Sequence, residues 1–365
     1  MGNVQLVGED CESNLLVMDT DITAERSYKK VNRQEINEYA EVRELVKQGG
    51  LMDKQPIYYT YKIATTAILL AISISVLILV ENMWVQYANA AFLALVFAQI
   101  GFIGHDSGHR QIFHSAHNNE ILSLIVSFLA ALERSWWLDK HNRHHNNPNH
   151  VLLDPDADFP VLAFTKEQAL KKKGIFRFIV MHQAFLFFPM LLLEGLGLRL
   201  AGFTYLVNNR VKFQVLEPVL MIGHFVVYFS LLFYFLDGWQ VLYFFIIHQA
   251  MFGLIMGSVF APNHKGMLMV EEEDDMDFLR RQVLTSRNVK PTWFSTFWYG
   301  GLNFQIEHHL FPSMSRNKLK ETQVIVRSIC EKYSIPYHET GITASYVEIL
   351  KYLHEESAPL RDNTF

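Results

Sequence analysis

Apolar residues gather into four long runs along the chain. Residues 63–80 and 85–104 contain no Asp, Glu, Lys or Arg, and neither do residues 219–236 and 241–261. A helix rises about 1.5 Å per residue, so each run is long enough to cross a hydrocarbon core of about 30 Å. Short links join the two runs of each pair. The pattern predicts an all-α integral membrane protein with four transmembrane helices, arranged as two hairpins.

Two further apolar segments fit a membrane span less well. Residues 121–132 would form a helix of only about 18 Å, which is too short to cross. Residues 175–200 are longer but are interrupted by Arg177, Pro189 and Glu194, among others. We expect both segments to form helices that lie in the membrane interface.

Polar segments flank the membrane part of the chain. We expect residues 1–58 to be a cytoplasmic N-terminal segment, residues 59–320 to form the membrane domain, and residues 321–365 to be a cytoplasmic C-terminal tail. Within the first segment, Asn32 and Glu35 have the spacing of a helix N-cap pair, and Gly49-Gly50 would end that helix. Its apolar positions recur at helical spacing: Ile36, Tyr39, Val42, Leu45 and Val46.

Positive charge is distributed unevenly around the four runs. The two short links contain no Lys or Arg, whereas the opposite flanks contain Lys54, Lys62, Arg110, Arg134, Lys140, Arg143, Lys171, Lys172, Lys173 and Arg177. Basic residues favour the cytoplasmic side of a membrane. Both termini are therefore expected to be cytoplasmic, with a helical cap on that side.

Composition narrows the class of protein further. The 365 residues are 50% apolar and 19% charged, with a net charge of −5. Such a chain is neither disordered nor a typical nucleic-acid binder, so no nucleic-acid partner is expected. The two cysteines, Cys11 and Cys330, are too few for a disulfide scaffold or a cysteine-based metal site. Histidine is unusually frequent, with 16 residues.

Eight of the histidines form four clusters at the ends of the apolar runs or outside them. The motif HDSGH holds His105 and His109, HNRHH holds His141, His144 and His145, APNHKG holds His264, and QIEHH holds His308 and His309. Residues three and four apart share one face of a helix, so each multi-histidine motif can direct its imidazoles at one point. Neutral imidazole is a common ligand of iron, zinc and copper. Because eight imidazoles exceed the needs of one ion, we predict two metals.

Membrane topology provides a test of this prediction. With four spans, all the clusters lie on one side of the bilayer and can converge. If residues 175–200 also crossed, QIEHH would face the side opposite to HDSGH, and no shared site could form. The isolated His182, His224 and His248 lie in apolar runs and are expected to be mainly structural, with His182 the strongest exception.

The motifs HDSGH, HNRHH followed by NNPNH and DPDAD, and LNFQIEHHLFP resemble the three histidine boxes of integral-membrane fatty acid desaturases. The resemblance covers residues 60–320. Gln305 in place of histidine in the third box is similar to the front-end branch (delta-5/delta-6-like), which inserts a double bond on the carboxyl side of existing ones. The resemblance implies a non-haem di-iron enzyme that inserts a cis double bond into a long-chain, already unsaturated acyl chain.

The resemblance also implies roles for individual residues. The metal ligands would be His105, His109, His141, His144, His145, His308 and His309, with His264 as an additional ligand. Gln305 would face the metals directly or through water, and Asp106, Glu307, Asp156 and His182 are further candidates for the metals or their surroundings. No catalytic side chain is expected beyond the ligands. Several side chains would line a headgroup entrance or anchor the chain at the interface: Arg110, Arg143, Trp136, Trp137 and Arg287.

The resemblance implies two iron ions, O2 as co-substrate, and an acyl lipid or acyl-CoA as substrate. Reducing O2 to water takes four electrons, of which the alkyl chain gives two. Many front-end enzymes carry a fused cytochrome b5 domain with an HPGG motif, which this sequence does not contain. A separate donor such as cytochrome b5 or ferredoxin is therefore expected. The membrane would be a bacterial inner membrane or the endoplasmic reticulum, with the histidine boxes on its cytoplasmic side.

Three alternatives remain open at this point. A lipid hydroxylase or a sphingolipid desaturase could use the same scaffold, and labelled O2 would distinguish an alcohol product from an alkene. A metal transporter is a remote alternative, because it would place ligands or charges near the middle of the bilayer.

Overall fold

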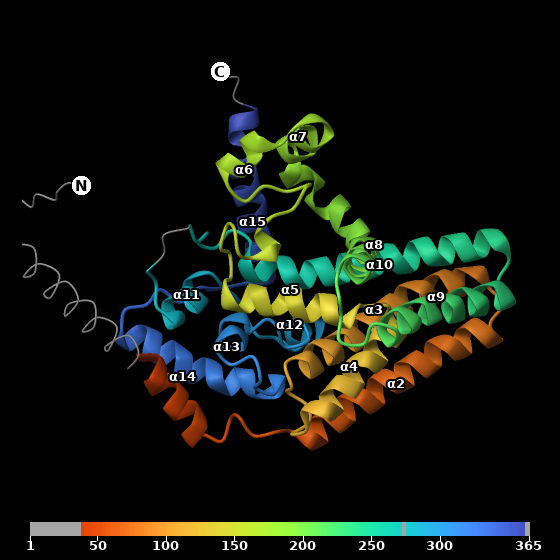
Figure 1. The fold of residues 1–365 in the computed structure, drawn as a ribbon, viewed down its shortest axis with the longest axis horizontal. Coiled ribbons are helices and arrows are strands. Elements are labelled where there is room, and N and C mark those ends of the chain that lie inside the picture. The colour runs from red at the N-terminus through yellow and green to blue at the C-terminus, as the bar shows by residue number, and fades with distance from the viewer. Residues whose placement is uncertain (1–37, 272–274, 362–365) are drawn as a thin grey trace, which may run out of the picture.

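The computed structural model describes residues 38–271 and 275–361, which are almost entirely helical (Figure 1). Residues 38–48 are helical and precede the first labelled element. The longer helices are α2 (Pro56–Leu79), α3 (Met83–Gly108), α4 (Ala116–Ala130), α5 (Arg134–Asn146), α8 (Gln183–Asn208), α9 (Leu216–Phe235), α10 (Gly238–His264), α14 (Leu319–Lys332) and α15 (Ile342–Glu356). The shorter elements are η1 (Pro155–Ala157), α6 (Lys166–Lys171), α7 (Gly174–Met181), α11 (Phe278–Leu284), α12 (Trp293–Trp298), α13 (Gln305–Leu310), η2 (Arg316–Lys318), η3 (Ala358–Leu360) and the paired strands β1 (Asn288–Val289) and β2 (Glu339–Thr340).

The four predicted apolar runs are confirmed as the helices α2, α3, α9 and α10, which lie alongside one another in Figure 1. Polar side chains close both hairpin tips. Asn82 caps α3 by accepting a 3.0 Å hydrogen bond from the Trp84 N–H, and Gln86 donates to the Val80 carbonyl at 2.6 Å. Asp237 and Gln240 form a reciprocal cap at the start of α10.

The central pair of the bundle, α3 and α10, is mostly buried and packs together. Both helices continue beyond their apolar runs, so that α3 ends after His105 and α10 ends at His264. The α2, α8 and α9 helices expose most of their apolar side chains. The polar, histidine-bearing ends of the two central helices therefore extend out of the apolar bundle.

The two segments expected in the interface are also helical. Residues 121–130 lie within α4, residues 131 and 132 follow its end, and α4 meets α5 at a bend of 112°. Residues 175–200 are divided at His182 into α7 and α8. The α8 helix is long and apolar enough to cross a membrane, which gives five candidate spans by length and composition instead of the four apolar runs, or six if α4 and α5 together make one.

The α8 helix packs on α10 where Gly195 and Gly253 bring the two backbones into contact. A Cβ atom added to Gly253 would lie 2.6 Å from the backbone nitrogen of Gly195, and one added to Gly195 would lie 2.7 Å from the Gln249 carbonyl oxygen. Neither position can hold a larger side chain without moving a helix. In Figure 1, α10 runs across the view, while α8 descends from α7 and crosses it.

A cap of short helices covers the histidine-bearing ends of the bundle. The predicted N-terminal amphipathic helix is confirmed over residues 38–48, where Val42 and Val46 pack into a core with α13 and α14. The Tyr39 hydroxyl donates to the Leu310 carbonyl at 3.0 Å. The expected cap pair Asn32 and Glu35, together with Ile36, lies outside the described residues.

Candidate metal centre

Eight histidines from four separate segments converge between the bundle and the cap. The α3 helix presents His105 and His109, α5 presents three histidines, α10 ends with His264, and α13 presents His308 and His309. The i, i+3, i+4 spacing on α5 directs its three rings to one side, as the sequence predicts. The structure thus brings together residues that lie up to about 200 positions apart, with His105 Nε2 at 3.2 Å from His308 Nε2.

A first group consists of four imidazoles whose ligand nitrogens all lie within 4.8 Å of one another: His105, His109, His141 and His308. Its shortest contact joins the Nε2 atoms of His109 and His141 at 2.8 Å. The Trp137 ring stacks on His141 at a centroid distance of 4.4 Å and covers one side of the group.

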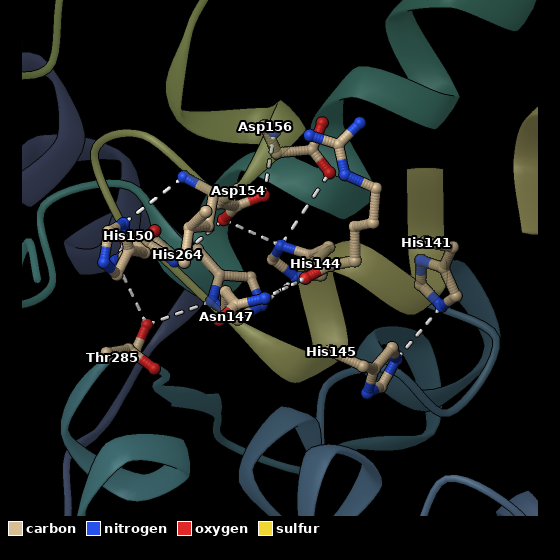
Figure 2. Close-up of polar contacts among 12 residues, drawn as sticks. His141, His144, His145, Asn147, His150, Asp154, Asp156, His264 and Thr285 are labelled. Atoms are coloured by element: carbon tan, nitrogen blue, oxygen red, sulfur yellow. Dashed lines mark hydrogen bonds and ion pairs between the residues drawn. The ribbon is translucent and has the colours of Figure 1, made fainter. Parts of the chain in front are cut away.

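A second group contains His144, His264 and His309, again with ligand nitrogens within 4.8 Å. The Nε2 atoms of His144 and His264 are 3.2 Å apart. His145 lies between the two groups, because its Nε2 is 3.1 Å from His141 Nε2 and its ring stacks on His309 at 4.2 Å. The eight rings therefore form two adjoining clusters, and the His144 side of this arrangement is shown in Figure 2.

Oxygen acceptors from the surrounding structure fix the orientation of the second group. Asp154 lies 2.9 Å from His144 Nδ1, and the Thr285 carbonyl lies 3.0 Å from His264 Nδ1 (Figure 2). Gln282 Oε1 lies 2.8 Å from His309 Nδ1. An acceptor at Nδ1 places the ring proton there, so the Nε2 atom of each ring carries a lone pair.

The first group has a comparable outer contact. Asp106 Oδ1 lies 3.1 Å from His105 Nδ1, while its other oxygen pairs with Arg316 Nε at 2.9 Å. This contact connects the first histidine motif to the segment that follows the third one. The ion pair is buried, so it holds the orientation of His105 with little competition from water.

These contacts test whether the site fits a metal. His144 and His264 both have an oxygen acceptor at Nδ1, so the lone pairs on their Nε2 atoms face each other at 3.2 Å, with the Gln305 amide nitrogen 3.0 Å from the one on His264. Such a pair repels unless a cation lies between the two atoms. Two nitrogens bound to one ion at about 2.1 Å are themselves about 3 Å apart. The described residues therefore fit a metal at this position.

The electrostatics of the site agree with metal binding. Burial, together with the neighbouring imidazoles, lowers the pKa of His141, His145, His308 and His309 well below the ordinary value. The rings are therefore neutral at pH 7, which is the form that binds metals.

The further predicted residues occupy different places. Gln305 lies within the site, with its amide nitrogen 3.0 Å from His264 Nε2 and its oxygen accepting from Asn263. Asp106 contacts His105 as described. Asp156 is 3.9 Å from His144 Nδ1, farther than Asp154, and pairs mainly with Lys140.

Glu307 and His182 do not face the histidine clusters. Glu307 bonds to Asn288 at 2.7 Å and Tyr337 at 2.8 Å, because it lies about 100° around the short α13 helix from His308. Burial raises the pKa of Glu307 to about 7. His182 lies at the break between α7 and α8 and packs on Phe178.

Sequence reasoning did not identify several residues that orient the site. Gln282 and Thr285 come from the segment around α11, Arg316 from η2, and Asn263 from the end of α10. Only Asn263 carried a local signal, since it directly precedes His264. Arg287, expected at an entrance or interface, is instead fully buried and bonds to the Pro262 carbonyl and Glu348.

A cavity of about 240 Å³ passes along both histidine clusters. Its wall includes His105, His141, His144, His264, His308 and Gln305. Away from the histidines, it continues between α3, α4, α8 and α10, where its lining is apolar and includes Val126, Leu132, Leu198 and Met256. An extended apolar molecule lying in this cavity would place one of its parts against the metal site.

Comparisons with known proteins agree with this geometry. The chain is 30% identical over 332 residues to an acyl-lipid (9-3)-desaturase of Physcomitrium patens, covering 88% of this chain and 62% of that protein. It is 29% identical to a delta(6)-fatty-acid desaturase of Caenorhabditis elegans, covering 91% of this chain and 78% of that protein. It is 26% identical to a delta(5) fatty acid desaturase of the same nematode, covering 86% and 73%. The chain thus spans less than two thirds of the moss relative. The family model described as fatty acid desaturase matches residues 82–341, and the protein belongs to the fatty acid desaturase family.

Proposed function

We propose that this protein is a membrane acyl desaturase that uses O2 and two irons to insert a cis double bond into a long-chain acyl group. The observation that carries the proposal is the pair of adjoining histidine clusters, which both contribute to the wall of one largely apolar cavity. An acyl chain lying there would pass directly beside both clusters.

The residues proposed to hold the irons are the eight converging histidines: His105, His109, His141, His144, His145, His264, His308 and His309. When bound, the irons supply the O2-dependent oxidising power that no side chain offers for an unactivated methylene. Asp106, Asp154 and the Thr285 carbonyl hold protons at Nδ1 and so keep the Nε2 atoms available as ligands. We propose that electrons come from a protein such as cytochrome b5 or ferredoxin.

Gln305 supports a front-end regiochemistry. It stands in the third motif where a histidine would complete the pattern, and its amide lies 3.0 Å from His264 Nε2. The relatives include desaturases named for the delta(5), delta(6) and delta(8) positions. We therefore propose an already unsaturated acyl chain as the substrate and a new double bond on its carboxyl side.

We further propose four membrane crossings, with α2, α3, α9 and α10 as the spans. The chain leaves the histidine site at the end of α3 and returns to it at the end of α5, so α4 and α5 together make no net crossing. It returns again at the end of α10. The stretch between these returns must cross an even number of times, and the α9–α10 hairpin already crosses twice. This parity supports an α8 that lies in the interface, with the site on the cytoplasmic side.

Product analysis of the purified protein tests the function. The protein in lipid nanodiscs, loaded with iron and supplied with a reductant system, is given linoleoyl substrates under ¹⁸O2. We expect an alkene with one additional double bond, ¹⁸O in water and none in the lipid. An alcohol that contains ¹⁸O would instead identify a hydroxylase, and the absence of any oxidised product would refute both activities.

A further inference from the structure

One part of the cavity wall, termed the lysine end, holds two ammonium groups. Lys140 and Lys265 line it, together with Asp156 and Glu194. The two lysines also flank metal-site histidines in the sequence, since Lys140 precedes His141 and Lys265 follows His264. The folding that gathers the imidazoles therefore also places two ammonium groups on the wall of the same cavity.

Both ammonium groups are held against the same aspartate. Lys140 Nζ lies 2.5 Å from Asp156 Oδ1, and Lys265 Nζ donates to the Asp156 backbone carbonyl at 2.5 Å. Lys265 Nζ also lies 3.8 Å from the centroid of the Phe164 ring. An ammonium has three N–H donors, and among the described residues each lysine meets one oxygen acceptor. Donors remain available to a molecule in the cavity.

The other charged groups on the cavity wall are already compensated. Arg134 pairs with Glu120 at 2.8 Å and Glu217 at 3.8 Å, and Glu133 accepts from the backbone N–H groups of Ser135 and Trp136. The lysine end is thus the part of the cavity that can receive an acceptor oxygen from a ligand.

We propose that Lys140 and Lys265 form a binding subsite for the polar end of the acyl substrate, in which the ammonium groups donate to its ester or thioester carbonyl and to the phosphate oxygens beyond it. This inference rests on the proposed desaturase function. Glu194 lies on the same wall and disfavours a free carboxylate, so the subsite fits an esterified acyl group better than a free fatty acid.

The position of this subsite fixes which carbons reach the irons. Asp156 Oδ2 is 3.9 Å from His144 Nδ1, and its other oxygen is 2.5 Å from Lys140 Nζ. With a carboxylate and an imidazole each about 2 Å across, Lys140 Nζ lies at most about 11 Å from His144 Nε2. An extended chain advances about 1.2 Å per bond, so fewer than about ten bonds separate the anchored carbonyl from the metal site. A chain held at this subsite presents carbons near its carboxyl end.

A purely structural role for the lysines predicts a different outcome. In that case the lysines would only neutralise Asp156 beside His144, and their loss would weaken iron binding. A substrate subsite instead predicts a higher KM and an altered double-bond position while iron stays bound. Measuring the iron content and the position of the new double bond therefore distinguishes the two roles.

The experiment compares Lys140→Gln, Lys265→Gln and the double variant with Lys172→Gln. Lys172 donates to the Phe159 carbonyl at 2.5 Å in the same region but does not line the cavity, which makes it a matched control. Iron-loaded proteins in nanodiscs receive linoleoyl-CoA, dilinoleoyl phosphatidylcholine or free linoleate. We expect the KM for the preferred ester to rise at least about tenfold in the double variant, with double bonds spread over neighbouring positions and iron content unchanged. Lys140→Arg keeps the positive charge and should therefore retain much of the substrate affinity that Lys140→Gln loses.

Each other outcome overturns a defined claim. An unchanged KM and product position in the double variant, or iron loss that accounts for the lost activity, would refute the subsite. Free linoleate bound as tightly as the esters would refute the preference for an esterified group, and the two ester arms identify which carrier is used. The affinity of the wild-type and double-variant proteins for linoleoyl-CoA can also be compared in the oxidised state under argon, where no turnover takes place. Failure of the wild-type protein to form an alkene would therefore refute the proposed function without deciding the subsite.

Discussion

Two sets of buried histidines in this protein have very different surroundings. His308 at the proposed metal site and His248 within the bundle are equally inaccessible, with 1% and 0% of their surface exposed. The His308 ring is surrounded by imidazoles, with His105 and His145 at centroid distances of 4.7 Å. The His248 ring instead packs edge-on against Phe97 at 4.6 Å. Burial alone therefore does not identify a ligand, whereas the convergence of several imidazoles does.

The bundle histidines resemble His144, His264 and His309 in one respect, because each of them has a partner at Nδ1. The Tyr228 hydroxyl lies 2.8 Å from His248 Nδ1, and the Phe128 carbonyl lies 2.7 Å from His224 Nδ1. Both rings pack edge-on against Phe97, and neither belongs to a group of three or more potential ligands among the described residues. A fixed tautomer thus prepares a metal site only where the Nε2 atoms also face one another.

The largest expected difference comes from removing one ring of each kind. His308→Ala should lower desaturation by more than about 100-fold and reduce bound iron, because it removes a proposed ligand from a site whose outer contacts alone are worth 10–100-fold. His248→Leu should keep both iron and most of the activity. Iron is measured by mass spectrometry and product by gas chromatography. Equal iron loss in both variants would show that His308 and His248 do not differ in their role in metal binding.

Changing the Nδ1 partners should produce a smaller but still selective effect. Asp154→Asn weakens the acceptor of His144 and should lower iron affinity by about 10–100-fold. Tyr228→Phe removes the partner of His248 and should cost about 1 kcal/mol of stability without affecting iron. Competition with a calibrated chelator measures affinity. If Asp154→Asn retained wild-type affinity, the orienting role of Asp154 would be wrong.

Metal removal should reveal which region the ions stabilise. Ligand at 100 times its Kd stabilises a folded protein by about 2.7 kcal/mol, so chelation should lower the unfolding temperature measured by tryptophan fluorescence. His248→Leu should start from a lower temperature and show the same decrease on chelation. His308→Ala should show a smaller decrease. A decrease of the same size in all three proteins would mean that the chelator acts elsewhere.

The last effect concerns the stability of the helix that carries three of the site histidines. Glu133 caps α5, and burial together with the neighbouring Glu217 raises the pKa of Glu133 to about 8 from the ordinary 4.5. Between these pH values the folded chain holds a proton that the unfolded chain has lost, so stability falls as pH rises and levels off above about pH 8. Glu133→Gln should flatten this dependence. Thermal unfolding from pH 5 to pH 9 measures it, and an unchanged slope would contradict the assignment.

The sequence predicted the ring-bearing faces better than the contacts that orient them. The i, i+3, i+4 spacing of His141, His144 and His145 is a local property of a helix, and the structure has that helix. By contrast, Arg316 pairs with Asp106 across about 210 positions, and Thr285 offers only a backbone carbonyl. Such contacts depend on the folded path of the cap, and no periodic pattern marks them.

The long helices show the same contrast. Uninterrupted apolar runs predicted α2, α3, α9 and α10, because a helix that could cross a membrane needs apolar side chains on all its faces. The α8 helix was harder to predict, since Arg199 within it is buried and satisfied by the carbonyls of Gly195 and Ala130. The charges that interrupt the apolar run therefore do not interrupt the helix.

The glycine contact between α8 and α10 has a consequence for the width of the cavity beside the histidine clusters. Leu191 and Leu198 line the cavity from α8, and Gly195 between them rests directly on the α10 backbone at Gly253. The absence of a Cβ atom at both positions thus sets how closely α8 approaches α10. Alanine at either glycine would move α8 away from α10 and widen the cavity between them. The range of acyl chains that the cavity accepts would then depend on two residues that do not line it.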